Sequence, residues 1–352
     1  MIRQLSSEAR VGIDAAIDAA VSRLQARGGE LGDAYAALTD AVGRAAGGGK
    51  RFRPALVVAS FEAFGAQPRD LPAIYPVAAS FELLHTAFVV HDDVIDHDVE
   101  RRGIPNIGGE FRARGMLRGA GPDAAAGLGD AAAILGGDLL LYEATRLIAL
   151  ADVPADVRAA LLGLFDDAVL VSAAGELADV ENALGDADPA ADSLIAAAHD
   201  KTAVYSFAAP LRAGALLAGA PERELDALRV CGGRLGLAYQ LVDDLIGAFG
   251  TPDQAGRDAG GDLREAKRTP LIALARQSPT WPHVSDALAM ARTGPVAVLE
   301  AQRVLDESGA RERLCRLIGD TLDGARSAAG TLPPAAAALV DEIAERIGER
   351  IP

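Results

Sequence analysis

Helical periodicity runs through almost the whole chain and limits the folds available to it. Apolar residues recur at the spacing of one helix face from residue 8 to residue 45, and the pattern returns in each long segment up to residue 350. The sequence lacks the alternating or Val/Ile/Thr-rich runs that are typical of strands. We therefore expect an all-α protein and, because no linker interrupts the pattern, a single helical-bundle domain over residues 1–352.

Glycine and proline place the expected helix boundaries, as at residues 47–49 and Pro54. Further helices are expected over residues 54–65, 77–98, 131–151, 155–182, 190–220 with a break near Pro210, 222–249, and in a last group from 263 to 350. Residues 103–130 are rich in glycine, so we expect a loop or an insertion interrupted by helix there. A polar loop is expected over residues 250–262.

The charge balance excludes several classes of partner. The chain has 34 lysines and arginines against 50 aspartates and glutamates, a formal net charge of −16. Nucleic acids and anionic membranes both require a basic face, so we expect neither as a partner. The two cysteines fit a reducing compartment, and we find no apolar signal core and no uncharged apolar stretch of about 18 residues. We expect a cytoplasmic protein without stable membrane insertion.

A first acidic cluster lies near the end of the apolar segment 77–98. On a helical wheel Asp92 and Asp96 share one face with His85 and Phe88, which places the two aspartate Cβ atoms roughly 5–6 Å apart. Carboxylates held this close repel each other unless a cation offsets their charge. Mg²⁺ suits this position, because it takes one or two carboxylates together with substrate phosphates. The alternative for this cluster alone is an acidic helix end exposed to water.

A second cluster repeats this geometry later in the chain. Gln240, Asp243, Asp244 and Gly247 share one face of the expected helix 222–249. Asp-Asp pairs are common at helix ends, so this cluster alone also has a plain structural explanation. The similarity of the two clusters suggests two acidic walls that face one cavity.

Basic residues beside both clusters point to a phosphorylated substrate. They follow the glycines 47–49, follow each acidic cluster, or open a helical stretch: Lys50, Arg51, Arg53, Arg101, Arg102, Lys201, Lys267 and Arg268. A glycine-rich turn before a helix is suited to binding an anion. Each basic group alone is also explained by a surface salt bridge. Together the acidic and basic groups indicate Mg²⁺-dependent diphosphate chemistry in a helical cavity, and the residues alone lead no further.

The chain resembles the trans-isoprenyl diphosphate synthases, or polyprenyl synthetase family. The matching segments occur in the family's order: GGGKRFRP (47–54), LLHTAFVVHDDVID (83–96), RRGIP (101–105), GGDLLL (136–141), GELADV (175–180), KT (201–202), YQLVDDLIGAFG (239–250) and GDLREAKRTPL (261–271). The Gly-rich insertion after RRGIP and the DDLIGAFG motif are most similar to those of actinobacterial geranylgeranyl diphosphate synthases.

The resemblance implies an all-α fold of the isoprenoid synthase type, with a central cavity, in a homodimer. It assigns the binding of about three Mg²⁺ ions to four aspartates, Asp92, Asp93, Asp96 and Asp243, with Asp244 and Gln240 assisting. It assigns the allylic diphosphate to Arg101, Lys201 with Thr202, and Lys267. It assigns the diphosphate of isopentenyl diphosphate to Lys50, Arg53, His85 and Arg102.

The implied reaction is a head-to-tail condensation of isopentenyl diphosphate with an allylic diphosphate. The allylic C–O bond ionises because metal and cationic side chains stabilise the leaving diphosphate, and a proton is then lost. The resemblance makes Ala87 a residue that limits product length, and the wheel places Phe88 on the aspartate face. A small Ala87 with a bulky Phe88 favours geranylgeranyl diphosphate, with farnesyl or longer products as the alternative.

Three positions depart from the family pattern. Gly247 stands where many relatives have a third aspartate, Glu176 stands where many have glutamine, and Gly261 leaves one acid fewer before Lys267. The other candidate functions are a class I terpene cyclase, a non-catalytic synthase subunit and an acidic helical scaffold. The cyclase would need an Asn/Ser/Glu motif where Asp243 and Asp244 stand. A non-catalytic subunit would be signalled by lost aspartates or basic groups, and this chain keeps nearly all of them. A scaffold leaves the ordered basic groups beside both acidic clusters unexplained.

Overall fold

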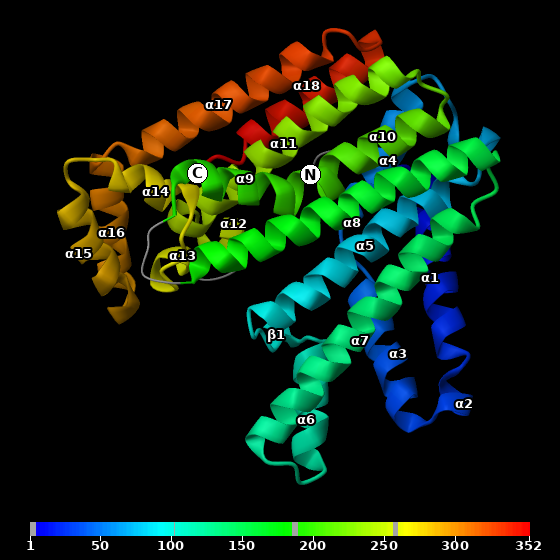
Figure 1. Ribbon diagram of the computed structural model, residues 1–352, viewed down its shortest axis with the longest axis horizontal. Coiled ribbons are helices and arrows are strands. Elements are labelled where there is room, and N and C mark those ends of the chain that lie inside the picture. Colours follow the sequence, from blue (N-terminus) through cyan, green and yellow to red (C-terminus); the bar gives the residue numbers. More distant parts are fainter. Residues whose placement is uncertain (1–4, 102, 185–188, 256–259) are drawn as a thin grey trace. The chain divides into compact units, whose positions relative to one another are not determined.

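The structure is a computed structural model that describes residues 5–101, 103–184, 189–255 and 260–352. Helices make up nearly all regular structure in these residues (Figure 1), and their only strands are β1 (Glu100–Arg101) and β2 (Ile104–Pro105), which pair antiparallel. The expected all-α class is confirmed. The described chain divides into two compact units: unit 1 is residues 5–165 with Ala213–Gly219, and unit 2 is Asp166–Arg212 with Ala220–Pro352. The single domain expected from the sequence stays a prediction.

The helices of unit 1 precede those of unit 2 along most of the chain. Unit 1 contains α1 (Ser7–Gln25), α2 (Gly28–Leu31), α3 (Asp33–Ala46), α4 (Phe52–Ala63), the 3₁₀ helix η1 (Pro68–Asp70), α5 (Ile74–Ile95), α6 (Ile107–Leu117) and α7 (Pro122–Ala149). α8 (Ala155–Ala183) begins in unit 1 and continues in unit 2, and most of α10 (Ala209–Leu217) belongs to unit 1.

Unit 2 contains the remaining elements. These are α9 (Ala191–Ala198), the π-helix η2 (His199–Ala208), α11 (Glu222–Phe249), α12 (Pro252–Ala255), α13 (Gly261–Arg264), α14 (Pro270–Arg276), α15 (Trp281–Met290), the 3₁₀ helix η3 (Ala291–Thr293), α16 (Pro295–Glu307), α17 (Ala310–Ala329) and α18 (Pro334–Gly348). Pro210 does not break the helical path, because it stands in the first turn of α10, where a missing N–H costs little.

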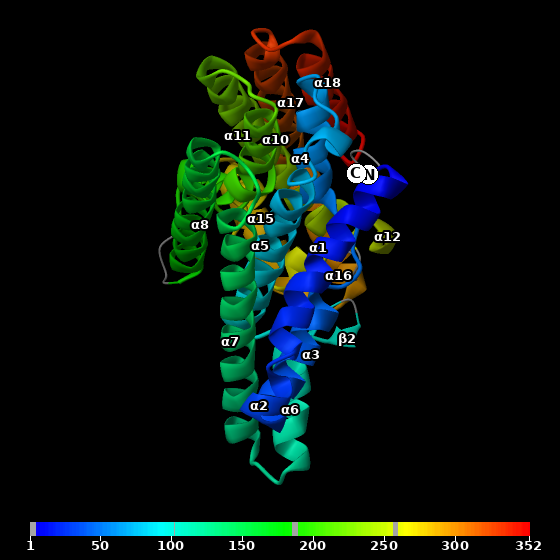
Figure 2. The ribbon, with the colours of Figure 1, turned by 90° about the vertical axis from the view of Figure 1, so that its right-hand side faces the viewer.

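α5 is the central helix of unit 1, because its sequence is apolar on nearly every side. It packs along α7 and also contacts α1 and α4, and Figure 2 shows α5 and α7 side by side. Most of its residues from Ile74 to Leu84 are buried. Burial of a helix on all sides fixes its position, so the aspartates at its C-terminal end stand on a firm support.

The glycine-rich stretch 103–130 is not a loop: of the two expected alternatives, it contains helix, as α6 and the start of α7, which form a helical hairpin. After the β1–β2 turn, the whole of α6 packs against the first half of α7. The glycines allow this close packing: a methyl group on Gly129 would lie 2.5 Å from the carbonyl oxygen of Gly108. Glycine here serves helix contact and does not break the helix.

α11 is the central helix of unit 2, and its packing against η2 depends on two glycines. A Cβ at Gly232 or Gly236 would overlap the backbone of Ala208 or Ala203, so the two helices touch backbone to backbone. α17 and α18 also contact α11. α11 therefore carries its aspartates in a position fixed from several sides.

α7 is the one helix of the described residues that is long and apolar enough to cross a membrane by length and composition alone. Core helices of soluble proteins pass the same test. α7 packs along both α5 and α6, which is the behaviour of such a core helix.

Candidate active site

The first aspartate cluster occupies the C-terminal end of α5. Asp92 and Asp93 lie in its last turn, and Asp96 is the C-cap residue. Asp93 is buried, with 5% of its surface exposed, whereas Asp92 is half-buried and Asp96 is exposed. The face that the helical wheel gives to Asp92 and Asp96 is therefore the more open one.

Arg101 joins this cluster from the β1–β2 turn. Its Nε and Nη2 atoms donate to Oδ1 of Asp93 at 3.0 and 2.5 Å, and Nη2 lies 3.7 Å from Oδ2 of Asp92. Burial raises the pKa of Asp93, although the hydrogen bonds from Arg101 act in the opposite direction. The predicted partners Asp93 and Arg101 are thus brought together. Arg102, which the resemblance also assigned, lies outside the described residues.

The glycine-rich turn before α4 is held by Arg51, a residue that the sequence analysis gave no specific role. Arg51 is only 4% exposed and has a left-handed backbone, with φ of 51°. It donates to Asp14 at 2.8 Å, to Glu82 of α5 at 3.3 Å and to the carbonyl oxygen of Ala46 at 3.0 Å. Arg51 therefore ties the turn to α5.

The two basic residues of this turn that were predicted to bind a diphosphate precede and follow Arg51 in the sequence. Lys50 is exposed and Arg53 is half-buried at the start of α4. His85 is half-buried on α5, three residues after Glu82. The anchoring by Arg51 thus fixes the turn that carries Lys50 and Arg53 against the helix that carries His85.

Replacing Arg51 with glutamine is expected to lower the free energy of unfolding by about 3 kcal/mol, because Glu82 would be left buried without its cation. Urea unfolding measures this loss. The matched control is Arg27→Gln, since Arg27 forms an exposed pair with Glu30 at 2.8 Å and its loss is expected to cost less than about 1 kcal/mol. Equal losses in the two variants would contradict the structural role of Arg51.

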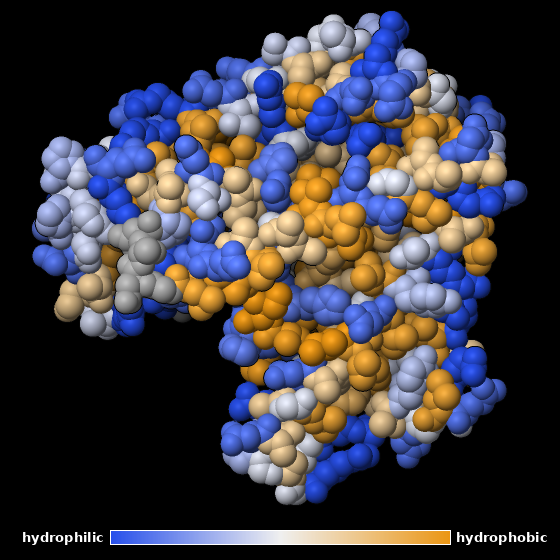
Figure 3. All heavy atoms as spheres, in the orientation of Figure 1, coloured by the Kyte–Doolittle hydropathy of each residue, from blue (hydrophilic) through white to orange (hydrophobic). Residues whose placement is uncertain are grey.

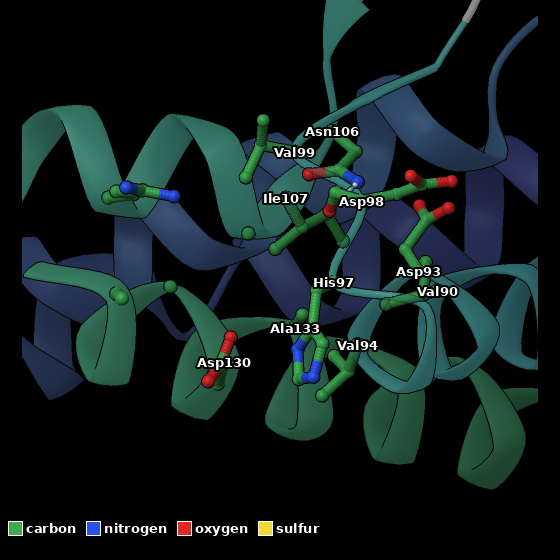
Figure 4. Close-up of a pocket in the computed structure, with 14 residues that line it drawn as sticks. Val90, Asp93, Val94, His97, Asp98, Val99, Asn106, Ile107, Asp130 and Ala133 are labelled. Carbon is green, nitrogen blue, oxygen red and sulfur yellow. Dashed lines mark hydrogen bonds between the residues drawn. The ribbon is translucent and has the colours of Figure 1, made fainter. Parts of the chain in front are cut away.

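Asp93 lines a pocket of about 230 Å³ within unit 1. It is lined by the end of α5, residues 97–99, Asn106, α6 and α7, and Figure 4 shows Asp93, His97, Asp98 and Asp130 around it. The lining also includes apolar side chains, among them Val90 of α5. Ala87 and Phe88, the residues predicted to limit product length, are not part of this lining; Ala87 is fully buried and Phe88 half-buried on α5.

The π-helix of unit 2 presents Lys201 to two acidic residues of α8. Lys201 Nζ lies 3.1 Å from Glu176 and 3.0 Å from Asp179. Gly175 permits this approach, because a side chain there would overlap the backbone of Asp200 and Lys201. Glu176, one of the three departures from the family pattern, is here a charged partner of the predicted Lys201.

A hydrogen-bonded chain connects the π-helix to the second aspartate cluster. Thr202 Oγ1 donates to Gln240 Oε1 at 2.9 Å, and Gln240 Nε2 donates to Asp244 Oδ1 at 3.1 Å. Burial raises the pKa of Asp244 to about 7, and the charges of Asp262 and Asp243 contribute to the same shift. The neighbouring carboxylates therefore add to the effect of burial on Asp244.

Asp243 is ion-paired with Arg350, a residue near the end of the chain that the sequence analysis missed. The guanidinium of Arg350 also stacks over the ring of Tyr239, 4.3 Å from its centroid. Burial raises the pKa of Asp243, against the lowering effect of Arg350. No sequence signal identifies this pair, because 107 positions separate the two residues.

Lys267 follows the short helix α13 and lies beside Asp262. Its Nζ is 3.7 Å from Asp262 Oδ1 and 3.4 Å from Glu265, and its backbone N–H donates to the carbonyl oxygen of Asp262 at 3.0 Å. Asp262 is buried and Lys267 is exposed. The predicted Lys201, Thr202, Gln240, Asp243, Asp244 and Lys267 all belong to unit 2.

The chemistry of these donors fits Mg²⁺. Among the described residues, no group of three or more Asp, Glu, His or Cys side chains is placed to hold a metal ion by itself. Mg²⁺ does not require one, because it commonly combines one or two carboxylates with phosphate oxygens and water. The carboxylates at the ends of α5 and α11 provide such partial sites.

The fold is similar to that of solved structures of one class of protein. The chain superimposes on a crystal structure of geranylgeranyl pyrophosphate synthase from Corynebacterium glutamicum, complexed with isoprenyl diphosphate and magnesium, with a TM-score of 0.81 over 97% of both chains and 28% identity. A polyprenyl synthase from Caulobacter crescentus CB15, complexed with calcium and isoprenyl diphosphate, gives a TM-score of 0.74 over 98% of this chain and 95% of that chain, at 28% identity. The fold is that of the isoprenoid synthases.

The family follows from the sequence comparison. The family model for polyprenyl synthetase matches residues 36–302, and a nonaprenyl diphosphate synthase of Mycobacterium tuberculosis is 30% identical over 86% of this chain and 84% of its own length. The chain belongs to the polyprenyl synthetase family. A (2E,6E)-farnesyl diphosphate synthase of Mycobacterium bovis is 38% identical over 63% of this chain. The matched region spans 55% of that relative's length.

Proposed function

We propose that the protein is a trans-prenyltransferase that condenses isopentenyl diphosphate head-to-tail with an allylic diphosphate, with geranylgeranyl diphosphate as its main product. The observation that carries this proposal is the presence, in one polyprenyl synthetase chain, of two aspartate-bearing helix ends that each have basic side chains beside them. Relatives are named farnesyl, geranylgeranyl and nonaprenyl diphosphate synthases, so the family supports the reaction, and product length rests on Ala87 and Phe88.

The aspartates of both units are proposed to hold the metal ions. Asp92, Asp93 and Asp96 serve on α5, and Asp243 serves on α11. Bound magnesium, with about three ions per site, supplies positive charge that stabilises the departing diphosphate. Asp93 has a second task, because its hydrogen bonds orient Arg101.

The basic side chains are proposed to divide between the two substrates. Arg101, Lys201 and Lys267 bind the allylic diphosphate, and Thr202 and Gln240 orient the groups around Asp244. The second set binds the diphosphate of isopentenyl diphosphate and comprises Lys50, Arg53, His85 and Arg102. Cationic side chains placed around a leaving diphosphate stabilise the charge that develops as the C–O bond breaks. The allylic cation must also be kept from water, which would convert it to an alcohol.

Incubation with labelled isopentenyl diphosphate, Mg²⁺ and one allylic primer at a time tests the function. Label in longer diphosphates supports the synthase, and the longest main product gives its chain length. Release of hydrocarbon from the primer alone would support a terpene cyclase instead. Absence of any reaction with every primer would favour a non-catalytic subunit and overturn the proposal.

The protein is also proposed to form a homodimer and to act in the cytoplasm. Leu128, Leu135 and Tyr142 recur every seven residues along α7, and their exposures are 38%, 55% and 57%. Figure 3 shows apolar side chains gathered on this face. A stripe of this kind on a soluble protein supports an interface between two copies.

Replacing Leu135 with aspartate is therefore expected to convert the dimer into a monomer, because a charge would be buried in the interface. Size-exclusion chromatography with light scattering measures the mass. Val296→Asp is the control, since Val296 is 81% exposed on α16 and is not one of the residues of this stripe. A parent protein that is monomeric at all concentrations would refute the homodimer.

A further inference from the structure

The loop that carries Lys267 is tied to the C-terminal end of α8 by the next residue, Arg268. Nη1 of Arg268 donates to the carbonyl oxygen of Asn182 at 3.1 Å and to that of Leu184 at 3.4 Å, across 86 and 84 positions of the chain. α8 ends at Ala183, and the last carbonyl groups of a helix have no helical N–H group to bond them. A cation at this end is also favoured by the helix dipole. Arg268 therefore caps α8 from a distant loop of the same unit.

The backbone of this loop has a conformation that depends on its surroundings. The N–H of Lys267 donates to the carbonyl oxygen of Asp262 at the end of α13, and Pro270 begins α14 three residues later. Between α13 and Lys267, Ala266 has a left-handed backbone with φ of 55°, which is less favourable for alanine than for glycine. Such a conformation persists only where neighbouring contacts hold it, and the bonds from Arg268 to α8 are contacts of this kind.

The same end of α8 holds the other lysine that is proposed to bind the allylic diphosphate. Glu176 and Asp179 lie in the last two turns of α8, and their carboxylates contact Nζ of Lys201 at 3.1 and 3.0 Å. Acidic side chains of α8 thus hold Lys201, and carbonyl groups of α8 hold the loop of Lys267. One helix end is therefore a common support for both lysines.

We propose that Arg268 is a positioning residue, which sets the position of Lys267 for the allylic diphosphate by fixing its loop to α8. The inference rests on the proposed function, because the task of Lys267 comes from there. The charge pattern of the sequence placed Arg268 among the basic groups after the second aspartate cluster, and the structure gives its guanidinium a backbone partner. Arg268 acts through Lys267 and not on the substrate itself.

Calorimetric titration with inorganic pyrophosphate in the presence of Mg²⁺ tests the proposal without turnover. Lys267→Ala is expected to weaken pyrophosphate binding by about 10- to 100-fold, the usual loss for a hydrogen bond from a charged group. Arg268→Gln is expected to weaken it by about tenfold, because Lys267 remains but its loop is no longer held in place. Arg268→Lys is expected to stay within about threefold of the parent, since both bonds come from one nitrogen and lysine also donates to the last carbonyl groups of helices.

Steady-state kinetics give a second readout that a general loss of stability would not give. Arg268→Gln is expected to raise the KM of the allylic primer by about tenfold. The KM of isopentenyl diphosphate, which is assigned to other basic residues, is expected to change by less than about twofold.

The double variant Lys267→Ala with Arg268→Gln is the decisive case. If Arg268 acts through Lys267, the double variant is expected to bind pyrophosphate within about twofold of Lys267→Ala alone. A direct contact of Arg268 with the diphosphate, or a general effect of lost positive charge, would make the two losses multiply. Arg316→Gln is the control, because Arg316 forms an exposed pair with Glu312 on α17 at 2.5 Å. Its pyrophosphate affinity is expected to match the parent.

Two results would overturn the inference. Parental pyrophosphate affinity in a folded Arg268→Gln protein would leave Arg268 as a cap of α8 and nothing more. Losses that multiply in the double variant would show that Arg268 acts independently of Lys267. Absence of prenyl transfer in the parent would refute the proposed function, whereas the pyrophosphate affinities of these variants would still decide the role of Arg268.

Discussion

Asp92→Ala is expected to lower kcat by about a thousandfold or more while leaving the free energy of unfolding nearly unchanged. Removing one group that stabilises charge in a transition state commonly costs about 10²–10³ in rate, and Asp92 also holds metal in the proposed site. The fold is expected to tolerate the change, because the side chain of Asp92 is 29% exposed and the hydrogen bonds between Arg101 and Asp93 stay in place. Incorporation of labelled isopentenyl diphosphate and urea unfolding measure the two quantities.

The matched control for Asp92 is Asp138→Ala. Asp138 is an aspartate of the same unit, on α7, with 61% of its side chain exposed and no role in the proposed chemistry. It is expected to keep the parent's activity. A rate in Asp92→Ala within tenfold of that control, in a folded protein, would contradict the role given to α5.

Ala87→Phe is expected to shorten the main product by one isoprene unit, and Phe88→Ala is expected to lengthen it. Ala87 is fully buried on α5, and Phe88 is one turn before Asp92 on the same helix. A ring at position 87 must take space from the interior, at a stability cost of about 1–3 kcal/mol. Removal of the ring at position 88 opens space along the face that leads away from Asp92.

Chromatography of the dephosphorylated products, with farnesyl diphosphate and its shorter homologues as primers, measures both chain lengths. Unchanged lengths in both variants would place the limit elsewhere, and α8, the helix of Leu170 and Val171, is the next candidate. Leu170 is 68% exposed on α8, so Val171, which is half-buried, is the better second target.

The helices could be predicted from the sequence wherever proline and glycine mark their ends. α11 runs over Glu222–Phe249, the expected bounds, because Pro221 and Gly250 delimit an amphipathic pattern. The same residue types misled the prediction for the α6–α7 hairpin. There Gly108 and Gly129 bring two helices into contact, and a sequence alone does not distinguish a glycine that packs from one that turns the chain.

The candidate site was predictable to the extent that its residues are close in sequence. The spacing of Asp92 and Asp96 gave the face of α5. The charge pattern of the sequence singled out Lys201 and Lys267, and the resemblance gave them their role. The partners of these groups were not predictable, because tertiary packing selects them. Arg350 reaches Asp243 from a distant part of the chain, and Asp262 meets Gly247 across a loop.

The number of residues in the π-helix η2 is critical for the position of Lys201. Its hydrogen bonds run from each residue to the fifth residue along, so it holds more residues per turn than its neighbours. Deleting one residue between Lys201 and Ala208 would rotate Lys201 about the helix axis, relative to the C-terminal part, by the turn of one residue, which in this wide helix is less than the ~100° of an α-helix. Lys201 would then swing away from Glu176 and Asp179. Deletion scanning should therefore find this stretch intolerant even where single substitutions are harmless.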